Sequence, residues 1–143
     1  MSTLNILLVE DNEGDIVLIQ EAFEEYNLSV NLDIVRDGEE AVNYLLNRGN
    51  QVEAKKPDLI ILDINLPKIN GHEVASIIKQ NDSTKQIPVV IFTTSSNDSD
   101  ISRAYYNLVN SYVIKPVDVN MFLKKIAEIG HYWSNVVRLP KNR

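Results

Sequence analysis

The sequence predicts an α/β domain, built as a parallel sheet with helices on both of its faces. Short apolar runs, such as residues 59–62, alternate along the chain with longer segments whose apolar residues recur at helical spacing. Continuous apolar runs are typical of strands buried on both faces, as the strands of parallel sheets are. Five such strands alternate with five helices, without an internal repeat or a low-complexity segment, which favours a single domain.

The first third of the chain predicts two strands with a helix between them. The apolar run at residues 4–9 predicts a strand that ends at Glu10 and Asp11. Residues 30–34 alternate between apolar and polar side chains, which predicts a half-buried edge strand. A helix is expected from about residue 14 to residue 26. Its inner face consists of Ile16, Ile19 and Phe23.

The middle of the chain predicts a second and a third helix, one on each side of the third strand. The second helix begins at Asp37, and a polar loop at residues 47–58 separates it from the strand at residues 59–62. The third helix is expected within residues 68–81. The inner faces of these helices comprise Ala41, Val42, Leu45 and Leu46, and Val74, Ile77 and Ile78.

The last third predicts two more strands and two more helices. A buried run at residues 87–92 carries Pro88 near its start, where a missing backbone N–H is tolerated. The segment "SNDSD" supplies side chains that cap helix N-termini, and a short strand at residues 112–114 ends at Lys115. The apolar faces of the fourth and fifth helices comprise Ile101, Ala104, Tyr105 and Leu108, and Phe122, Ile126, Ile129 and Trp133.

Composition and charge narrow the function classes. The net charge of −6 and an isoelectric point near 4.9 argue against nonspecific binding to nucleic acid or to anionic membranes. The chain contains no cysteine, which excludes disulfides and thiol chemistry. The N-terminus lacks the basic region of a signal peptide, and no apolar run approaches the roughly 18 residues that a membrane span needs. We therefore expect a cytoplasmic protein.

Polar and charged residues follow the predicted strands at their carboxyl ends. Because ligands of doubly wound sheets bind beyond that edge, we expect these residues to converge on one crevice. Taken alone, Asp63 could have only a structural role, in which its carboxylate accepts hydrogen bonds from backbone N–H groups of a turn. The residues expected in the crevice are Glu10, Asp11, Asp63, Thr93, Thr94 and Lys115.

This set of side chains fits phosphoryl transfer. Three carboxylates that lie close together repel one another unless a cation neutralises them, and an all-oxygen ligand set favours Mg²⁺. A carboxylate such as that of Asp63 can also act as a nucleophile and form an aspartyl-phosphate. Lys115 and the Thr93 hydroxyl would then hold oxygens of the transferred group.

Five short motifs carry a resemblance to a known family. They are "LLVEDN" at 7–12, "LDINLP" at 62–67, "NG" at 70–71, "FTTS" at 92–95 and "VIKP" at 113–116. In this order and spacing they resemble the receiver domain of the two-component response regulators. The resemblance implies a flavodoxin-like, doubly wound sheet of five parallel strands in the order 2-1-3-4-5, which is also the order of the chemotaxis regulator. It implies a single receiver domain over residues 1–143, with a core at about 4–137 and a short C-terminal tail.

The resemblance implies a role for each acidic residue of the crevice. Asp63 would be the phosphoacceptor. Asp11 would bind Mg²⁺ directly with the help of Glu10, and the backbone carbonyl of Asn65 would complete the protein ligands. In that case the protein is not an enzyme, although it assists its own phosphorylation and dephosphorylation.

The remaining motif residues would hold the phosphoryl group and respond to it. Thr93 would bond to it, Lys115 would pair with it, and Thr94 would be a neighbouring contact. Tyr112 would be the aromatic switch that moves inward when the Thr93 hydroxyl moves. The resemblance further implies a cis peptide bond between Lys115 and Pro116, a conformation largely confined to bonds that precede proline.

The resemblance also implies protein partners, and neither nucleic acid nor membrane. The donor would be a histidine kinase or a phosphotransfer protein that docks near residues 12–19 and 116–119. Because no DNA-binding segment follows the receiver pattern, we expect a stand-alone regulator. The first helix, the long loop and the segment "HYWSNVVRLP" are similar to the regulators that partner bacterial phytochromes. This finer similarity implies a phytochrome-type kinase and a homodimer through the fourth helix, the fifth strand and the fifth helix.

Two alternative functions remain open from the sequence. A hydrolase would form the same aspartyl-phosphate, but such enzymes use a second acidic residue two positions after the nucleophile, where this chain has Asn65. A degenerate receiver would act only as a protein-binding module, although every reactive position is filled. His72 and His131 are isolated in the sequence, so we expect surface groups and not ligands.

Overall fold

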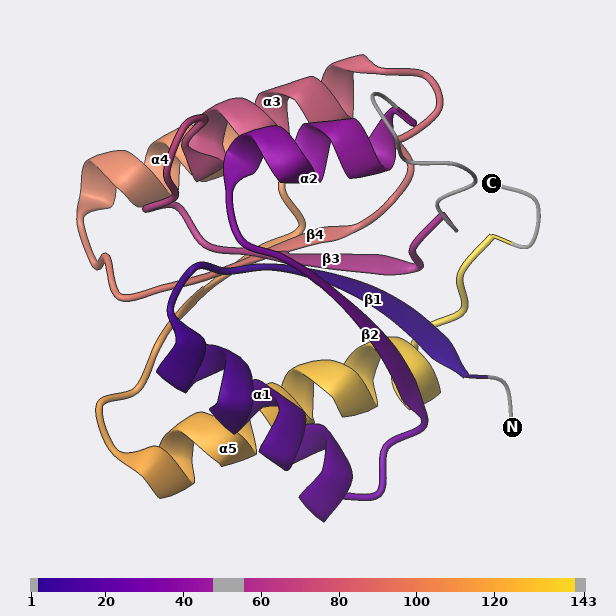
Figure 1. The fold of residues 1–143 in the computed structure, drawn as a ribbon, viewed down its shortest axis with the longest axis vertical. Helices are drawn as coiled ribbons and strands as arrows, with labels where there is room; N and C mark the ends of the chain where they lie inside the picture. The colour runs from indigo at the N-terminus through magenta and orange to yellow at the C-terminus, as the bar shows by residue number, and fades with distance from the viewer. Residues whose placement is uncertain (1–2, 48–55, 141–143) are drawn as a thin grey trace.

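The computed structural model describes residues 3–47 and 56–140, and in them five strands alternate with five α-helices (Figure 1). All strands are parallel and form one sheet in the order β2-β1-β3-β4-β5, which confirms the predicted fold class and strand order. Most of the predicted polar loop and the last three residues of the tail lie outside the described residues. The strands are β1 (Leu4–Val9), β2 (Val30–Val35), β3 (Leu59–Leu62), β4 (Val89–Thr93) and β5 (Ser111–Ile114).

Helices cover both faces of the sheet, as predicted (Figure 1). One face is covered by α2 (Gly38–Leu45), α3 (Gly71–Gln80) and α4 (Asp98–Tyr106). The other face is covered by α1 (Glu13–Glu25) and α5 (Val119–His131), which continues into a π-helical turn at Tyr132–Val136. Among the described helices, none combines the length and the apolar character needed to cross a membrane.

The sheet divides the core into two apolar layers. Neighbouring residues of β1, such as Leu7 and Leu8, enter opposite layers because successive side chains of a strand point to opposite faces. β3 and β4 are buried along their whole length, as their continuous apolar runs predict. β2 alternates between half-buried and exposed residues at the edge of the sheet, which confirms the predicted edge strand.

Local contacts fix where the helices begin above the carboxyl edge of the sheet. Asn12 and Asn70 accept hydrogen bonds from backbone N–H groups in the first turns of α1 and α3. Gly71 begins α3 at a point where a side chain has no room, because a Cβ atom there would lie 2.1 Å from the backbone oxygen of Asp63. The absence of a side chain at Gly71 therefore lets α3 pack directly against the end of β3.

The fourth helix departs from the expectation. Of its predicted apolar face, only Ala104 is fully buried, whereas Tyr105 is 48% exposed and Leu108, beyond the helix end, is 68% exposed. α4 lies beside the edge strand β5, so only a narrow part of its surface reaches the core. The exposed aromatic residues of α4 are therefore available to other molecules.

Candidate functional site

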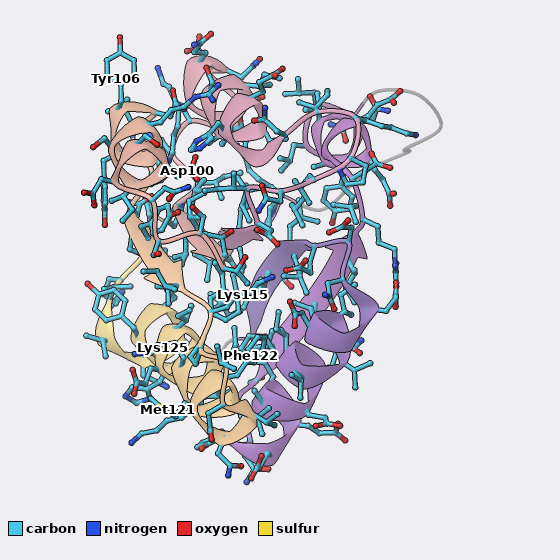
Figure 2. All side chains as sticks on the ribbon, turned by 90° about the vertical axis from the view of Figure 1, so that its left-hand side faces the viewer. Asp100, Tyr106, Lys115, Met121, Phe122 and Lys125 are labelled. Carbon is cyan, nitrogen blue, oxygen red and sulfur yellow. The ribbon has the colours of Figure 1, made fainter. Side chains whose placement is uncertain are left out.

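Charged side chains from three strand ends meet above the carboxyl edge of the sheet. The ammonium nitrogen of Lys115 lies 2.7 Å from Oε1 of Glu10, 2.9 Å from Oδ2 of Asp63 and 2.7 Å from Oδ2 of Asp15. Glu10 follows β1, Asp63 follows β3 and Lys115 follows β5, so the topology brings distant residues to one nitrogen atom. Figure 2 shows Lys115 near the middle of the molecule.

The cluster is almost closed to solvent. The exposed fractions are 1% for Glu10, 7% for Asp63 and 8% for Lys115. Because an unpaired buried charge is very costly, the cluster depends on the contacts between its opposite charges. The ring of Phe92 adds a cation–π contact, with its centroid 5.9 Å from the Lys115 nitrogen.

Three carboxylates of the crevice form a group that fits a hard metal ion. One oxygen from each of Glu10, Asp11 and Asp63 lies within 4.8 Å of the others. Asp11 is exposed, so an ion held there keeps access to water ligands, which Mg²⁺ usually retains. An all-oxygen donor set of this kind suits Mg²⁺ or Mn²⁺ better than a softer ion.

Burial and repulsion shift the protonation of the cluster. Burial, followed by the charge of Asp63, raises the pKa of Glu10 to about 7 against the opposing hydrogen bond from Lys115. Burial alone would lower the pKa of Lys115, but its hydrogen bonds to Asp15 and Glu10 outweigh burial and raise that pKa. Lys115 therefore stays charged at neutral pH, and the carboxylates around it still carry excess negative charge that a divalent cation would offset.

The turn after β3 holds the carboxylate of Asp63. Its Oδ1 accepts a hydrogen bond of 2.7 Å from the Ile64 N–H, while Oδ2 accepts one from Lys115. The Asp63 N–H donates to the Val9 carbonyl at 3.1 Å and continues the pairing of β3 with β1. Asp63 thus does accept a backbone hydrogen bond within the turn, but only one of its carboxylate oxygens does so. The other oxygen lies in the crevice.

Thr93 ends β4 and is completely buried. Its hydroxyl has no hydrogen-bond partner within residues 3–47 and 56–140. Buried hydroxyl groups usually have a partner, so this one is an exception and is free to bond to a group that enters the crevice. Thr94, the next residue, is exposed at the rim of the crevice, as is Asn65 after β3.

Tyr112 connects the edge strand to the loop that follows β4. Its hydroxyl donates a hydrogen bond of 2.9 Å to the backbone carbonyl of Ser95, two residues after Thr93. The side chain of Tyr112 is half-buried. The Tyr112 hydroxyl is thus bound by the loop that begins after Thr93.

The predicted cis peptide bond between Lys115 and Pro116 is wrong, because the described residues contain no cis peptide bond. Even before proline the trans form is favoured, by about 0.5–1 kcal/mol. Lys115 reaches its carboxylate partners with this bond in the trans form, and its backbone N–H donates to the Thr93 carbonyl at 2.7 Å. The geometry of the crevice therefore does not require the cis form.

Asp15 is a member of the cluster that the sequence analysis missed. It binds Lys115 from the first turn of α1 and is half-buried. The sequence did hold a signal for Asp15, because it lies at the start of the helix that follows Glu10 and Asp11. A carboxylate at that position also interacts favourably with the helix N-terminus.

The expectation that His72 lies at the surface is also wrong. His72 is 3% exposed, and its Nε2 lies 3.0 Å from Oδ1 of Asp100 on α4. The spacing of three residues from His72 to Ala75 and on to Ile78 places all of them on the buried face of α3, and this periodicity was the available signal. His131 is exposed, as expected.

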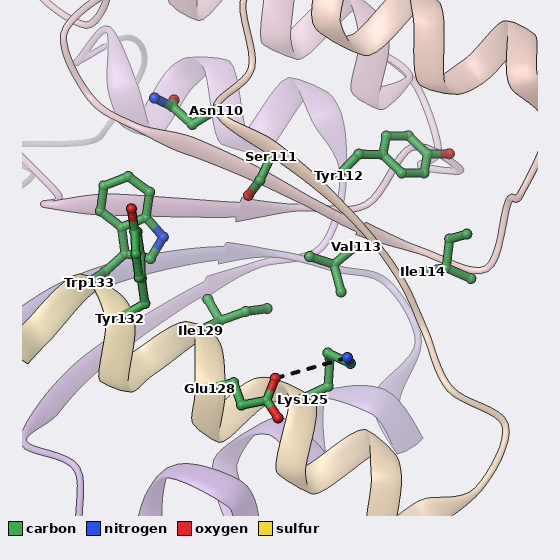
Figure 3. Close-up of a pocket in the computed structure, with 10 residues that line it drawn as sticks. All are labelled: Asn110, Ser111, Tyr112, Val113, Ile114, Lys125, Glu128, Ile129, Tyr132 and Trp133. Carbon is green, nitrogen blue, oxygen red and sulfur yellow. Dashed lines mark ion pairs between the residues drawn. The ribbon is translucent and has the colours of Figure 1, made fainter. Parts of the chain in front are cut away.

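A second concavity lies outside the sheet edge, away from the crevice. This groove of about 800 Å³ runs between β5 and the C-terminal part of α5 (Figure 3). Tyr132 and Trp133 lie at one end and Ile114 at the other, while Lys125 and Glu128 on α5 form an ion pair of 3.9 Å. The groove is thus part of the face formed by β5 and α5.

The chain matches a known family over most of its length. The family model described as "Response regulator receiver domain" matches residues 6–127, which include every residue of the crevice. The chain is 43% identical over 136 residues to the probable methanogenesis regulatory protein FilR2 of Methanothrix harundinacea, covering 94% of this chain and 86% of that protein. It is 41% identical over 135 residues to the response regulator Rcp1 of Synechocystis, covering 94% of this chain and 92% of that protein.

Solved structures agree with the sequence comparison. The phosphorylated cyanobacterial phytochrome response regulator RcpA superposes with a TM-score of 0.94 at 41% identity, covering 98% of this chain and 100% of that chain. The Mn²⁺-bound form of Rcp1 superposes with a TM-score of 0.91 at 40% identity, covering 96% of this chain and 99% of that chain.

Proposed function

This chain belongs to the family of response regulator receiver domains, and we propose that it accepts a phosphoryl group on Asp63 and signals through the resulting change in its surface. The observation that carries this proposal is the contact of the Lys115 ammonium with the Asp63 carboxylate, inside a buried acidic cluster. An ammonium held at this point offsets the negative charge of an arriving phosphoryl group.

Glu10, Asp11 and Asp63 would hold Mg²⁺, with the backbone carbonyl of Asn65 as a further ligand. Two features support this assignment: the carboxylate oxygens lie close together, and burial together with the charge of Asp63 raises the pKa of Glu10, so a cation would favour its ionised form. The related Rcp1 has been crystallised with Mn²⁺, so a divalent ion binds to that protein. When bound, the ion supplies positive charge that reduces the repulsion between Asp63 and the oxygens of the incoming group.

Asp63 acts as the nucleophile. One of its carboxylate oxygens attacks the phosphorus atom of the donor, and the bond from phosphorus to the leaving atom breaks as the new O–P bond forms. From a phosphohistidine donor, the electron pair of the broken P–N bond returns to the imidazole ring. The chain is a phosphoacceptor that assists its own phosphorylation and dephosphorylation and does not turn over a separate substrate.

Thr93, Lys115 and Thr94 bind the phosphoryl group once it is attached. The ammonium of Lys115 pairs with one phosphoryl oxygen, and the orphaned hydroxyl of Thr93 donates a hydrogen bond to another. Thr94 stands at the rim as a neighbouring contact. The attached phosphoryl group carries roughly −1.5 to −2 charges in place of the single charge of the Asp63 carboxylate, and its oxygens draw these groups from their present positions.

Movement of Thr93 is passed to the surface through Tyr112. The loop after Thr93 carries Ser95, whose carbonyl binds the Tyr112 hydroxyl. When Thr93 moves towards the phosphoryl group, the space available to the Tyr112 ring changes, and with it the surface of α4 and β5. The two arrangements must differ by only a few kcal/mol for one modification to redistribute them.

A histidine kinase or a phosphotransfer protein is the proposed donor, and the similarity to RcpA and Rcp1 favours a phytochrome-type kinase in the cytoplasm. The donor would dock beside the crevice, on the start of α1 and on residues 116–119. Exposed apolar side chains in these segments support this assignment, because apolar groups in solvent mark contact surfaces. They are Val17, Val117 and Val119.

We further propose a homodimer through α4, β5 and α5. Tyr106 is 85% exposed and projects away from α4 (Figure 2). Ile114 on β5 and Tyr132 after α5 are also exposed, and both line the groove of Figure 3. Together these side chains form an apolar face on one side of the molecule, as expected of a surface that a second copy covers.

Labelling with acetyl phosphate and Mg²⁺ tests the function. We expect one phosphoryl group per chain by intact mass spectrometry, and none in Asp63→Asn. Asp98→Asn is the matched control, because it removes an exposed carboxylate in α4 and should be labelled like the wild type. Persistent labelling of Asp63→Asn would place the acceptor elsewhere, and steady hydrolysis of p-nitrophenyl phosphate would favour a hydrolase instead.

A further inference from the structure

A buried polar contact joins α3 to α4 next to the crevice. Nε2 of His72 lies 3.0 Å from Oδ1 of Asp100, and the Asn107 side chain donates a hydrogen bond of 3.3 Å to the His72 carbonyl. Hydrogen bonds from Ser95 and then from His72 lower the pKa of Asp100, so this carboxylate is ionised and accepts. Nε2 of His72 must therefore carry the hydrogen atom.

The ring of His72 depends on this contact. Its Nδ1 is buried and has no partner in the part of the chain that the structure describes. The bond to Asp100 is thus the polar contact that offsets the burial of the ring, and the loss of Asp100 would leave both ring nitrogens without a partner. Because a hydrogen bond depends on direction as well as on distance, this contact fixes how α3 and α4 lie relative to each other.

Asp100 passes the contact on to the loop after β4. Its second oxygen, Oδ2, accepts a hydrogen bond of 2.5 Å from the Ser95 hydroxyl, while the Ser95 carbonyl accepts the bond from the Tyr112 hydroxyl. One residue, Ser95, therefore joins the side chain of Asp100 to the side chain of Tyr112. The path from His72 to Tyr112 consists of three hydrogen bonds.

The other end of the path is fixed to the phosphoacceptor strand. His72 directly follows Gly71, whose N–H donates to the Ile64 carbonyl at 2.8 Å and whose Cα packs against the backbone of Asp63. The position of His72 is thus set by the strand end that carries Asp63. Because His72 is held in place in this way, its hydrogen bond to Asp100 can fix the positions of α4 and of the loop after β4.

We propose that His72 is a positioning residue, which through Asp100 and Ser95 holds the loop after β4 in the arrangement that binds the Tyr112 hydroxyl. Contacts that exist in one arrangement favour that arrangement over the alternatives. The role of Tyr112 as a reporter of phosphorylation rests on the proposed function, whereas the effect of His72 on the Tyr112 equilibrium does not.

Tyrosine-labelled NMR measures this equilibrium directly, with the Tyr112 signal assigned by Tyr112→Phe. The ratio of bound to free hydroxyl should fall about fivefold in His72→Leu, since one net hydrogen bond corresponds to about that factor. His72→Gln keeps an N–H near the position of Nε2 and should restore the wild-type ratio. Asp100→Ala removes the acceptor and should resemble His72→Leu. The double variant His72→Leu/Asp100→Ala should show no further loss, because both substitutions remove the same contact.

Asp98→Ala is the matched control, because it removes a carboxylate from the same turn of α4 outside the path. A merely structural role for His72 would lower the melting temperature and leave the Tyr112 ratio unchanged, and that result would overturn the proposal. An Asp100→Ala protein whose ratio equals that of Asp98→Ala would also overturn the proposal. This comparison decides the question even if His72→Leu does not fold.

Labelling of the same proteins with acetyl phosphate and Mg²⁺ separates the two proposals. A wild type that cannot be labelled would contradict the proposed function, while the Tyr112 ratios of the unphosphorylated variants would still decide the role of His72. In the labelled state, His72→Leu and Asp100→Ala should carry the phosphoryl group and still show the reduced ratio. An equal ratio in labelled wild type and labelled variants would mean that His72 does not act in the phosphorylated form, contrary to the proposal.

Discussion

The ammonium of Lys115 lies 2.9 Å from Oδ2 of Asp63, although the two residues follow different strands and are 52 positions apart in sequence. The same nitrogen contacts Glu10 and Asp15. A single positive charge therefore faces three carboxylates and offsets only part of their negative charge. Lys115, or another cation in its place, stabilises this arrangement.

Replacement of Lys115 by Met should destabilise the metal-free protein strongly. Removal of one partner from a buried ion cluster leaves uncompensated charge, which typically costs about 3–5 kcal/mol of unfolding free energy. Mg²⁺ should return part of this stability, because the carboxylates left behind bind it. Denaturant unfolding with and without Mg²⁺ measures both effects.

Lys68→Met is the control for that experiment. Lys68 is exposed and its nitrogen lies 3.7 Å from both Asp37 and Glu39, so its loss should change the unfolding free energy by less than about 1 kcal/mol. Equal losses in the two variants would show that the buried contacts of Lys115 contribute no more than a surface pair.

The raised pKa of Glu10 predicts an unusual dependence of stability on pH. The folded protein holds a proton on Glu10 up to about pH 7, whereas the unfolded chain releases it near the ordinary value of 4.5. This contribution to stability is therefore complete below about pH 4.5 and is lost as the pH rises to about 7. Without Mg²⁺, we expect Glu10→Gln to remove a decline on the order of 2–3 kcal/mol over that range.

The free energy of unfolding is measured with a chemical denaturant at several pH values, for the wild type and for Glu10→Gln. The difference between the two curves isolates the contribution of Glu10 from that of the other carboxylates. Two parallel curves would contradict the prediction. Saturating Mg²⁺ should also flatten the wild-type curve, because a bound cation favours the ionised carboxylate.

The orphaned hydroxyl of Thr93 predicts that its removal does not harm the fold. Thr93→Val replaces a buried, unpaired hydroxyl by a methyl group of similar size, so the unfolding free energy should stay equal or rise by up to about 1 kcal/mol. Thr84→Val is the matched control: the Thr84 hydroxyl is buried and donates to the Ile78 carbonyl at 2.7 Å. That variant should lose about 1–3 kcal/mol.

After phosphorylation, Thr93→Val should be the more strongly affected of the two variants, the reverse of the order expected for stability. Thr93→Val should still be labelled on Asp63 but should lose the response of Tyr112, whereas Thr84→Val should keep it. A marked destabilisation of Thr93→Val would instead indicate that the hydroxyl has a structural partner.

Elements whose side-chain periodicity or strand ends carry the information could be predicted from the sequence. Continuous apolar runs marked β3 and β4 as buried strands, alternation marked β2 as an edge, and the rule that ligands bind beyond the carboxyl ends placed Asp63 with Lys115. These features follow from local spacing and from topology, and both can be recognised in a single sequence.

Polar contacts that depend on one specific partner were not predicted. Helical spacing places His72 on the buried face of α3, but the partner that accepts its hydrogen bond, Asp100, lies 28 positions away. Asp15 joins the cluster because Lys115 reaches across to it. Contacts of this kind depend on the exact separation of elements in space, which residue spacing within one helix does not contain. The isomer of the Lys115–Pro116 bond likewise depends on a small energy difference that the local sequence does not decide.

The apolar face of α4, β5 and α5 predicts self-association that a single charge should weaken. Tyr106 is the most exposed aromatic residue of that face, so Tyr106→Glu places a carboxylate where a second copy would have to bury it. Residues at the centre of interfaces commonly contribute 2 kcal/mol or more, so we expect the dimer dissociation constant to rise by at least about tenfold. Val17→Glu introduces the same charge at a half-exposed position on α1, outside α4, β5 and α5, and should leave the constant unchanged. Light scattering over a concentration series, before and after labelling with acetyl phosphate and Mg²⁺, measures both variants. Equal dissociation constants for Tyr106→Glu and Val17→Glu would exclude this face, and a wild type that stays monomeric in both states would exclude the dimer.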